Sequence, residues 1–243
     1  MKSNGNYESK YSNVLTMVLV VLVVIILGIA GYFMYSIHET KTKNESAQTA
    51  MADFEQATKT VRKKVKDNQE NETEQNTVEE EIVKPNMSAY ESEQETESQE
   101  QESTEPEKIM YEGYEVKGTI NIPKTNCNYP VLAEVTKHSL EVAVAILYGP
   151  GLNEPGNTVI VGHNYRNGLF FSNNSKLAIG DKVTIKSSNE TVDYIIYKMY
   201  YTTPDDASYM KRDVEEGVRE ISLSTCNNDS SQRLIIWAKE EGK

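Results

Sequence analysis

The chain has 243 residues, a formal net charge of −12 and a hydrophobic content of 38%. The charge is uneven, because residues 1–66 carry a net +4, residues 67–108 a net −13 and residues 109–243 a net −3. No basic stripe is available to neutralise phosphates, which argues against nucleic acid as a partner.

Residues 14–35 form an apolar run without a charged residue. At 1.5 Å per residue this run reaches about 30 Å as a helix, which matches the hydrocarbon core of a bilayer. A cleaved signal peptide is the alternative, but its apolar region is shorter, about 7–15 residues. We therefore expect an uncleaved single-pass anchor in the cell membrane. Lysines on both sides leave the orientation open, and the simplest topology makes residues 1–13 a cytoplasmic tail and places the following domain outside the cell.

Two polar segments follow the apolar run. Residues 36–66 are good helix formers in which Ala47, Met51 and Phe54 recur at a spacing of three or four, so they predict an amphipathic juxtamembrane helix. Residues 67–108 are dominated by Glu, Gln, Asn, Ser and Thr and cannot bury enough apolar surface to fold. We expect a disordered acidic linker there, a stalk that holds the next domain away from the bilayer.

The composition changes at residue 109, and residues 109–243 contain short β-type runs separated by turn signals. Short helices are expected over 169–177 and 204–210, the second capped by Asp205 or Asp206. Seven or eight short strands predict an all-β domain, either a closed antiparallel barrel or a sandwich. The clearest strand candidates are 118–122, 142–148, 158–162, 182–185, 191–203, 221–226 and 233–238.

Three residues at strand ends carry the candidate chemistry. Cys226 ends one predicted strand and Arg233 opens the next, so a hairpin would place a thiol beside a guanidinium. A cysteine nucleophile acts as a thiolate and needs a cationic neighbour or a base. His163 ends another apolar strand, whereas His38 lies beside the apolar run and His138 in a polar loop. Each of the three would usually be structural if it stood alone, but together they predict a cysteine transferase or protease.

Their order and context resemble the sortases. The family pattern at the cysteine is Thr-Leu-x-Thr-Cys, and Ser222 stands where threonine is usual, which is a mild departure. The resemblance covers roughly residues 112–240. It rests on Gly162-His163, Leu223–Cys226, Arg233, Ile122-Pro123, Pro155–Asn157 and Leu177–Asp181.

The resemblance implies a closed eight-stranded sortase-like β-barrel transpeptidase on the outer face of a Gram-positive membrane. Its substrates would be surface proteins with a C-terminal sorting signal of the Leu-Pro-x-Thr-Gly type. Cys226 would attack the carbonyl of the signal's threonine, and His163 would protonate the leaving amine. Arg233 would donate to the oxyanion or orient the peptide, with Thr225 and Asn164 as supporting or substrate-binding residues. The acyl acceptor would be an amine of a peptidoglycan precursor or of a pilin.

The remaining candidates are weaker. Cys127 lies in a turn-like stretch and is interpreted as incidental, although a single bridge to Cys226 stays open in an oxidising compartment. Glu154, Glu190 and Asp193 lack a recognisable calcium-ligand spacing, so neither a metal nor another cofactor is expected.

Two alternatives remain for the activity, and one choice remains within the family. A cysteine endopeptidase would release surface proteins by hydrolysis, and a non-catalytic β-domain would only bind wall components. Pilus-polymerising sortases typically carry a lid with an Asp-Pro-aromatic motif and often a C-terminal anchor. Neither feature is present here, which favours the wall-anchoring type.

Overall fold

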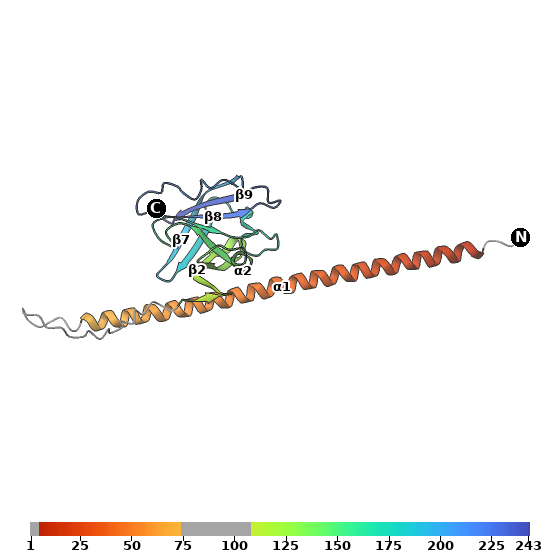
Figure 1. Ribbon diagram of the computed structural model, residues 1–243, viewed down its shortest axis with the longest axis horizontal. Helices are drawn as coiled ribbons and strands as arrows, with labels where there is room; N and C mark the ends of the chain where they lie inside the picture. The colour runs from red at the N-terminus through yellow and green to blue at the C-terminus, as the bar shows by residue number, and fades with distance from the viewer. Residues whose placement is uncertain (1–4, 74–107) are drawn as a thin grey trace, which may run out of the picture.

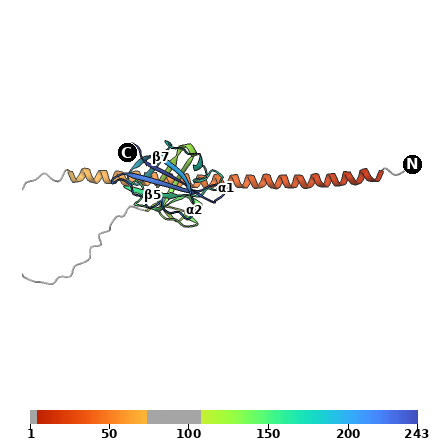
Figure 2. The same ribbon diagram turned by 90° about the horizontal axis from the view of Figure 1, so that it is seen from above.

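The structure is a computed structural model that describes the backbone of residues 5–73 and 108–243 and the side chains of residues 13–60 and 108–243. One long helix, α1 (Gly5–Thr73), runs past a compact β-domain that lies against its C-terminal half (Figures 1 and 2). Residues 74–107, which make up most of the predicted acidic linker, lie outside the described residues.

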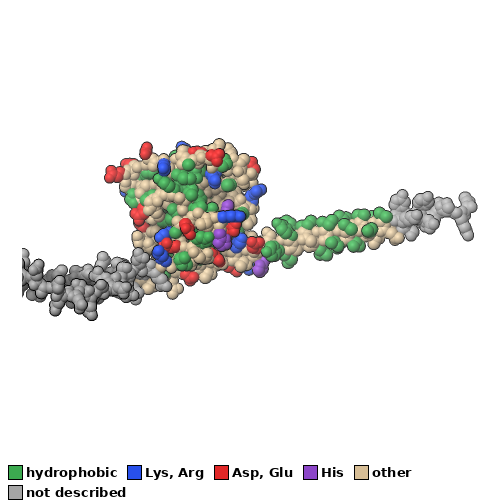
Figure 3. All heavy atoms as spheres, viewed as in Figure 1, with side chains coloured by type: hydrophobic (Ala, Val, Ile, Leu, Met, Phe, Trp, Pro, Cys, Tyr) green, Lys and Arg blue, Asp and Glu red, His purple; other side chains and the backbone are tan. Residues whose placement is uncertain are grey.

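The N-terminal half of α1 is apolar and exposed. Hydrophobic side chains cover it in Figure 3, and over residues 14–35 the large ones are at least 47% exposed. Within the described residues, α1 is the one helix long and apolar enough to cross a membrane. The helix continues through the predicted juxtamembrane segment 36–66 and ends at Thr73, seven residues inside the segment predicted as linker. Three of these seven residues, Gln69, Glu70 and Glu72, are good helix formers, which is compatible with the continuation.

The β-domain is built from one sheet that closes on itself. Its strand order is β1-β2-β3-β4-β5-β8-β9-β7-β6, and a pairing between β2 and β6 closes the ring. The closed eight-stranded barrel is therefore confirmed, with the short β1 as an extra strand on β2. The strands are β1 (Met110–Tyr111), β2 (Tyr114–Ile122), β3 (Cys127–Leu132), β4 (Val144–Tyr148), β5 (Gly156–Val161), β6 (Lys182–Ser187), β7 (Thr191–Thr202), β8 (Arg219–Cys226) and β9 (Arg233–Glu240).

The barrel is not wholly antiparallel, and this part of the prediction is wrong. β3 pairs with β4 in parallel, and β5 pairs with β8 in parallel over six residue pairs. The connection after β3 crosses to β4, whereas β6 and β7 lie between β5 and β8 along the chain, so the strand ends do not simply alternate. As a result, the ends of β5 and β8 meet at the same end of the barrel.

Several local predictions differ from the structure. The turn predicted around Cys127 covers only the 3₁₀ helix η1 (Pro123–Thr125) and Asn126, whose φ of 52° closes the turn. Cys127 instead begins β3, which the sequence pattern conceals because Pro130 interrupts it. The predicted strand 142–148 is preceded by a short helix, α2 (Ser139–Val142), and begins at Val144.

Neither predicted helix in the second half of the domain forms as expected. Within 169–177 there is only the 3₁₀ helix η2 (Asn174–Lys176). The segment 204–210 is a series of turns, in which the carboxylate of Asp206 accepts hydrogen bonds from Thr202 and from the backbone N–H of Ser208. Side-chain bonds of this kind favour turns over helix.

One face of α1 packs on the barrel. The buried residues of this stripe recur every three or four positions, as the sequence predicted for an amphipathic face: Ala47, Ala50, Met51, Phe54 and Thr58. Ala47 joins the main core of the barrel, and Phe54 packs in a second cluster with residues of β2, β3 and β4. The barrel thus contacts the chain before residue 67. This contact differs from the expectation that residues 67–108 separate the barrel from the apolar run.

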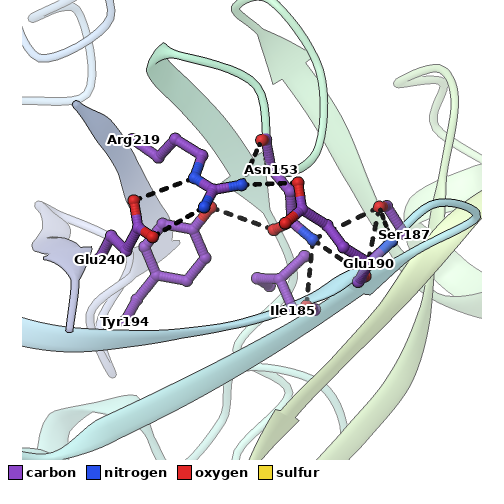
Figure 4. A network of polar contacts seen from close by, with 7 residues as sticks. All are labelled: Asn153, Ile185, Ser187, Glu190, Tyr194, Arg219 and Glu240. Carbon is purple, nitrogen blue, oxygen red and sulfur yellow. Dashed lines mark hydrogen bonds and ion pairs between the residues drawn. The ribbon is translucent and has the colours of Figure 1, made fainter. Parts of the chain in front are cut away.

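A polar network lies across the barrel between β6, β7, β8 and β9 (Figure 4). The guanidinium of Arg219 donates two hydrogen bonds to Glu240, at 2.7 and 3.0 Å, and one to Glu190, at 2.6 Å. The buried amide of Asn153 accepts a hydrogen bond from Tyr194, at 3.0 Å. Arg219 pairs with Gly156 at the start of β5, so this network marks the end of the barrel opposite the end of β8.

Candidate active site

His163, Cys226 and Arg233 come from three neighbouring strands. Cys226 at the end of β8 pairs directly with Arg233 at the start of β9. In the parallel β5–β8 ladder Val161 pairs with Ser224, so His163 and Cys226 each lie two positions further along. Neighbouring strands are about 5 Å apart. The structure therefore places the backbone positions of His163, Cys226 and Arg233 on adjacent segments at one end of the barrel.

The three side chains are on the outer face of this sheet. Partners in a ladder project to the same side, and residues two apart on a strand share a face. Val161 and Ile235, which share this face, pack in a small cluster that also contains Tyr209 and is separate from the main barrel core. The candidate site thus lies on the outer wall of the barrel, at its rim, which is a position that an extended peptide could approach.

The backbone leading into His163 is tightly packed. The N–H of Gly162 donates to the carbonyl of Ser224 at 3.2 Å, which extends the parallel pairing beyond β5. A Cβ at position 162 would lie 2.8 Å from Val144 and 2.9 Å from Phe171, so only glycine fits without displacing these side chains. The Gly162-His163 pair is therefore explained by close packing, which places His163 where the strand leaves the barrel.

Asn164 joins the loop after His163 to the cysteine strand. Its amide Nδ2 donates to the backbone carbonyl of Cys226 at 3.0 Å and to Oδ1 of Asn228 at 3.1 Å. Its Oδ1 accepts from the N–H of Arg166. Asn164 thus cross-links the two segments that carry the imidazole and the thiol. This geometry fits a supporting role, in which the side chain fixes the relative position of the two groups.

His163 is covered on one side by Tyr165, a residue that the sequence reasoning missed. The two ring centroids are 4.8 Å apart at an interplanar angle of 32°, and Tyr165 in turn contacts Phe170. Burial lowers the pKa of His163, and the carboxylate of Glu141 opposes this effect. The neutral imidazole is therefore favoured. An aromatic residue two positions after the histidine was the available signal.

The contact with Tyr165 leads to a prediction about pH. Activity should depend on pH through the protonation of His163, the candidate acid–base residue. Tyr165→Ala removes part of the burial, so the pKa of His163 should rise toward its ordinary value. The limb of the rate profile that belongs to His163 should then move to higher pH, and NMR titration of the imidazole should move in the same direction. Tyr165→Phe keeps the ring and serves as the control; an unmoved or lowered midpoint in Tyr165→Ala would contradict the assignment.

Within the described part of the chain, a single hydrogen bond orients the side chain of Arg233. Its Nε donates to the carbonyl of Pro204 at 3.1 Å, and its two terminal nitrogens have no hydrogen-bond partner among the described residues. Pro204 belongs to the β7–β8 connection, which is itself fixed by Asn157, whose Nδ2 donates to the carbonyls of Tyr209 and Met210. The guanidinium is thus oriented by a fixed loop while its planar fork stays available for a ligand.

Ser222 and Thr225 are two of the three hydroxyl residues that precede Cys226 in β8. The Oγ of Ser222 donates to Oδ1 of Asn157 at 2.8 Å, a bond that the usual threonine would also supply, so the departure from the family pattern preserves this contact. The Oγ1 of Thr225 is buried and has no hydrogen-bond partner within the described residues. Buried polar atoms are rarely left unpaired. Thr225 precedes Cys226 in β8 and projects to the opposite face of the sheet, so its hydroxyl is an unpaired polar group toward the barrel interior.

Among the described residues, the remaining candidates from the sequence have no contact with this site that supports a catalytic role. Cys127 is 1% exposed, and its burial raises the pKa of the thiol, so it is an unreactive core residue. Both cysteines are free. Within residues 13–60 and 108–243, no three His, Cys, Asp or Glu side chains form a group able to hold a metal ion. Asp229, in the turn between β8 and β9, accepts hydrogen bonds from the backbone N–H and the hydroxyl of Ser231.

A surface hollow of about 690 Å³ lies elsewhere. It is lined by Tyr148–Pro150, Asn157 and Met210–Asp213. Asn157 is the second residue of β5, so the hollow lies toward the start of that strand and away from His163. None of the three candidate catalytic residues lines it.

Known proteins that are similar to this chain are sortases. The sortase domain family matches residues 120–241. Sortase A of Bacillus anthracis is 29% identical over 125 residues, a match that spans 50% of this chain and 58% of that protein. Two solved structures are also similar over about half of this chain. Sortase A from Corynebacterium diphtheriae, as a lid mutant, is 25% identical with a TM-score of 0.49, covering 54% of this chain and 72% of that one. A Clostridium perfringens sortase D5 transpeptidase is 24% identical with a TM-score of 0.48, covering 53% and 80%.

The family match contains every residue of the candidate site, from His163 to Arg233. It also contains strands β3 to β9 and the last residues of β2. Because the sortase domain matches half of the chain, the chain belongs to the sortase family.

Proposed function

We propose that this protein is a membrane-anchored cysteine transpeptidase that cleaves a C-terminal sorting signal of surface proteins and transfers them to an amine of the cell wall. The observation that carries the proposal is the alignment of His163, Cys226 and Arg233 on three neighbouring strands. Membership of the sortases, a family of cysteine transpeptidases, supports the reaction class.

In the first half-reaction the neutral His163 takes the proton of the Cys226 thiol, and the resulting thiolate attacks the carbonyl carbon of the signal's threonine, in a Leu-Pro-x-Thr-Gly-like sequence. The negative charge that develops on the carbonyl oxygen is within the reach expected of the Arg233 guanidinium. The peptide C–N bond then breaks, and the imidazolium of His163 gives its proton to the leaving amine of the glycine. A thioester on Cys226 and a neutral His163 remain.

In the second half-reaction an amine attacks the thioester. His163 takes a proton from the incoming amine, the C–S bond breaks, and the thiolate of Cys226 returns. A new amide joins the surface protein to the acceptor. An amine of a peptidoglycan precursor is the proposed acceptor, and a pilin amine is the second possibility that the acceptor assay distinguishes.

The proposed location is the cell membrane, with α1 crossing it once and the barrel on the extracellular side. The exposed apolar half of α1 supports an anchor, because so large an apolar surface is unfavourable in water. The barrel would then meet both the sorting signal and the wall precursor outside the cell.

Product analysis with and without an amine tests the reaction class. The purified protein is incubated with a Leu-Pro-x-Thr-Gly peptide library, alone and with a short primary-amine peptide, and the products are identified by mass. We expect an amide product that replaces the hydrolysis product as the amine is raised. Hydrolysis alone at saturating amine would instead identify an endopeptidase, and no cleavage of any peptide would favour a non-catalytic wall-binding domain.

A further inference from the structure

Helix α1 and strand β3 run in the same direction where they touch. Gln48 and Asn128, near the start of β3, exchange two hydrogen bonds, at 3.0 and 3.1 Å. One to two turns further on, Phe54 packs in a cluster with Leu132 at the end of β3. The N-terminal, apolar half of α1 therefore extends beyond the barrel on the side where β3 starts.

The start of β3 is at the same end of the barrel as the candidate site. β3 is parallel to β4, β4 is antiparallel to β5, and β5 is parallel to β8. The ends of β5 and β8, which lead to His163 and Cys226, thus lie at the end where β3 begins. Figure 1 agrees, because the C-terminus that follows β9 lies on the side of the barrel away from the N-terminal half of α1.

Apolar and polar contacts together hold this arrangement. Ala47 is 0% exposed and belongs to the barrel core, while Phe54 is 2% exposed. The carboxylate of Glu55 pairs with Lys186 on β6 at 3.1 Å. The contacts extend from Ala47 to Thr58, about three turns, which is enough to fix both the position and the direction of the helix on the barrel.

The helix is continuous between the apolar run and the docked segment. Ala47 lies twelve positions after Tyr35, which corresponds to about 18 Å at 1.5 Å per residue. An extended peptide covers that height with about five or six residues. The candidate site is therefore placed at a short, fixed height and not at the end of a long tether.

We propose that the docked part of α1 is a rigid spacer that turns the catalytic end of the barrel toward the membrane and holds it about 18 Å from the end of the apolar span. The inference rests on the proposed membrane anchor. It also restricts the substrate. The site can bind a sorting signal that lies within a few residues of a membrane-embedded segment of the substrate. A signal displayed far from the membrane is out of reach.

Energy transfer to the bilayer tests the orientation without requiring catalysis. The full chain with Cys226→Ala is placed in vesicles of phosphatidylcholine and phosphatidylglycerol that carry a headgroup-attached acceptor dye. A donor dye is attached through Lys176→Cys, near the catalytic end, or through Asn189→Cys, in the β6–β7 turn at the other end; both positions are exposed. β6 alone spans about 20 Å. We expect clearly stronger transfer from position 176 than from position 189.

Two outcomes would overturn the inference. Equal transfer from both positions would show that the barrel is not held in one orientation, and stronger transfer from position 189 would show that the site faces away. If the protein does not co-float with the vesicles, the proposed membrane anchor is contradicted, and the inference that rests on it fails as well. Ala47→Asp places a charge in the docked face and should abolish the difference, whereas Ala52→Asp, on the exposed face, should keep it.

The height is tested by its effect on two substrates. Inserting an 18-residue helical segment between Thr40 and Lys41 adds five whole turns, about 27 Å, and leaves the docked face unchanged. Cleavage of a signal peptide linked to a vesicle lipid by a short spacer should fall at least tenfold, while cleavage of the soluble peptide stays unchanged. If the insertion variant and the parent cleave the lipid-linked peptide at equal rates, the spacer role is contradicted and the catalytic proposal is untouched. If the parent itself cleaves neither peptide, the catalytic proposal is contradicted.

Discussion

Replacing Cys226 by alanine is expected to lower peptide transfer by about 10⁴-fold or more, because no other group in the site can carry the acyl chain. Cys226 is partly exposed at the end of β8, beside the positions of His163 and Arg233. The measurement is the steady-state rate of amide formation with the signal peptide and the primary-amine acceptor. A variant that retains a substantial fraction of the rate would show that Cys226 is not the nucleophile.

The second cysteine provides a matched control. Cys127→Ala removes a thiol that is buried at the start of β3, far from solvent. Its rate should stay within about threefold of the parent, with a stability cost of about 1 kcal/mol from the lost packing. Alkylation of the native protein followed by peptide mapping should label Cys226 and leave Cys127 unlabelled. The opposite labelling pattern would contradict the assignment of the two thiols.

Arg233→Ala is expected to lower kcat/KM by about 10²–10³-fold, the range found when an oxyanion donor is removed. The guanidinium is oriented by its bond to Pro204 and its terminal nitrogens remain available, so its loss leaves the developing charge without this donor. Arg233→Lys should recover little of the rate, because an ammonium lacks the planar fork. Arg166→Ala, in the exposed loop after His163, is the matched control and should stay near the parent rate.

The separate kinetic constants distinguish two roles of Arg233. An oxyanion donor acts in the transition state, so its loss lowers kcat and leaves KM nearly unchanged. A residue that only orients the peptide binds ground state and transition state alike, and its loss raises KM. We expect the effect mainly in kcat, and an effect confined to KM would assign Arg233 to substrate binding.

The barrel could be predicted from local patterns. Strands such as β8 and β9 alternate apolar and polar residues or form short apolar runs, and turn residues separate them, so the pattern within each strand is enough. The candidate residues were predicted at strand ends, where a side chain can be exposed to solvent while the barrel fixes its backbone. Their order along the chain, together with the family pattern, led to His163, Cys226 and Arg233 before their strands were known to be neighbours.

The features that were missed depend on contacts between distant parts of the chain. The stripe on α1 at Ala47 and Phe54 indicates an apolar face but does not name its partner, so the docking on the barrel was not foreseen. The contact of Tyr165 with His163 requires the turn after β5, and the bond from Asn164 to Cys226 requires the parallel register of β5 and β8. Strand β3 was missed because its proline is unfavourable in a regular strand.

The most direct test of the account is the mass of the enzyme during turnover. The protein is mixed with the signal peptide in the absence of an amine, quenched in acid, and its intact mass and peptide map are recorded. We predict an adduct equal to the acyl half of the peptide, located on Cys226, which disappears when the amine is added and the amide product forms. Cleavage without an adduct on Cys226, or an adduct on another residue, would contradict the thioacyl mechanism.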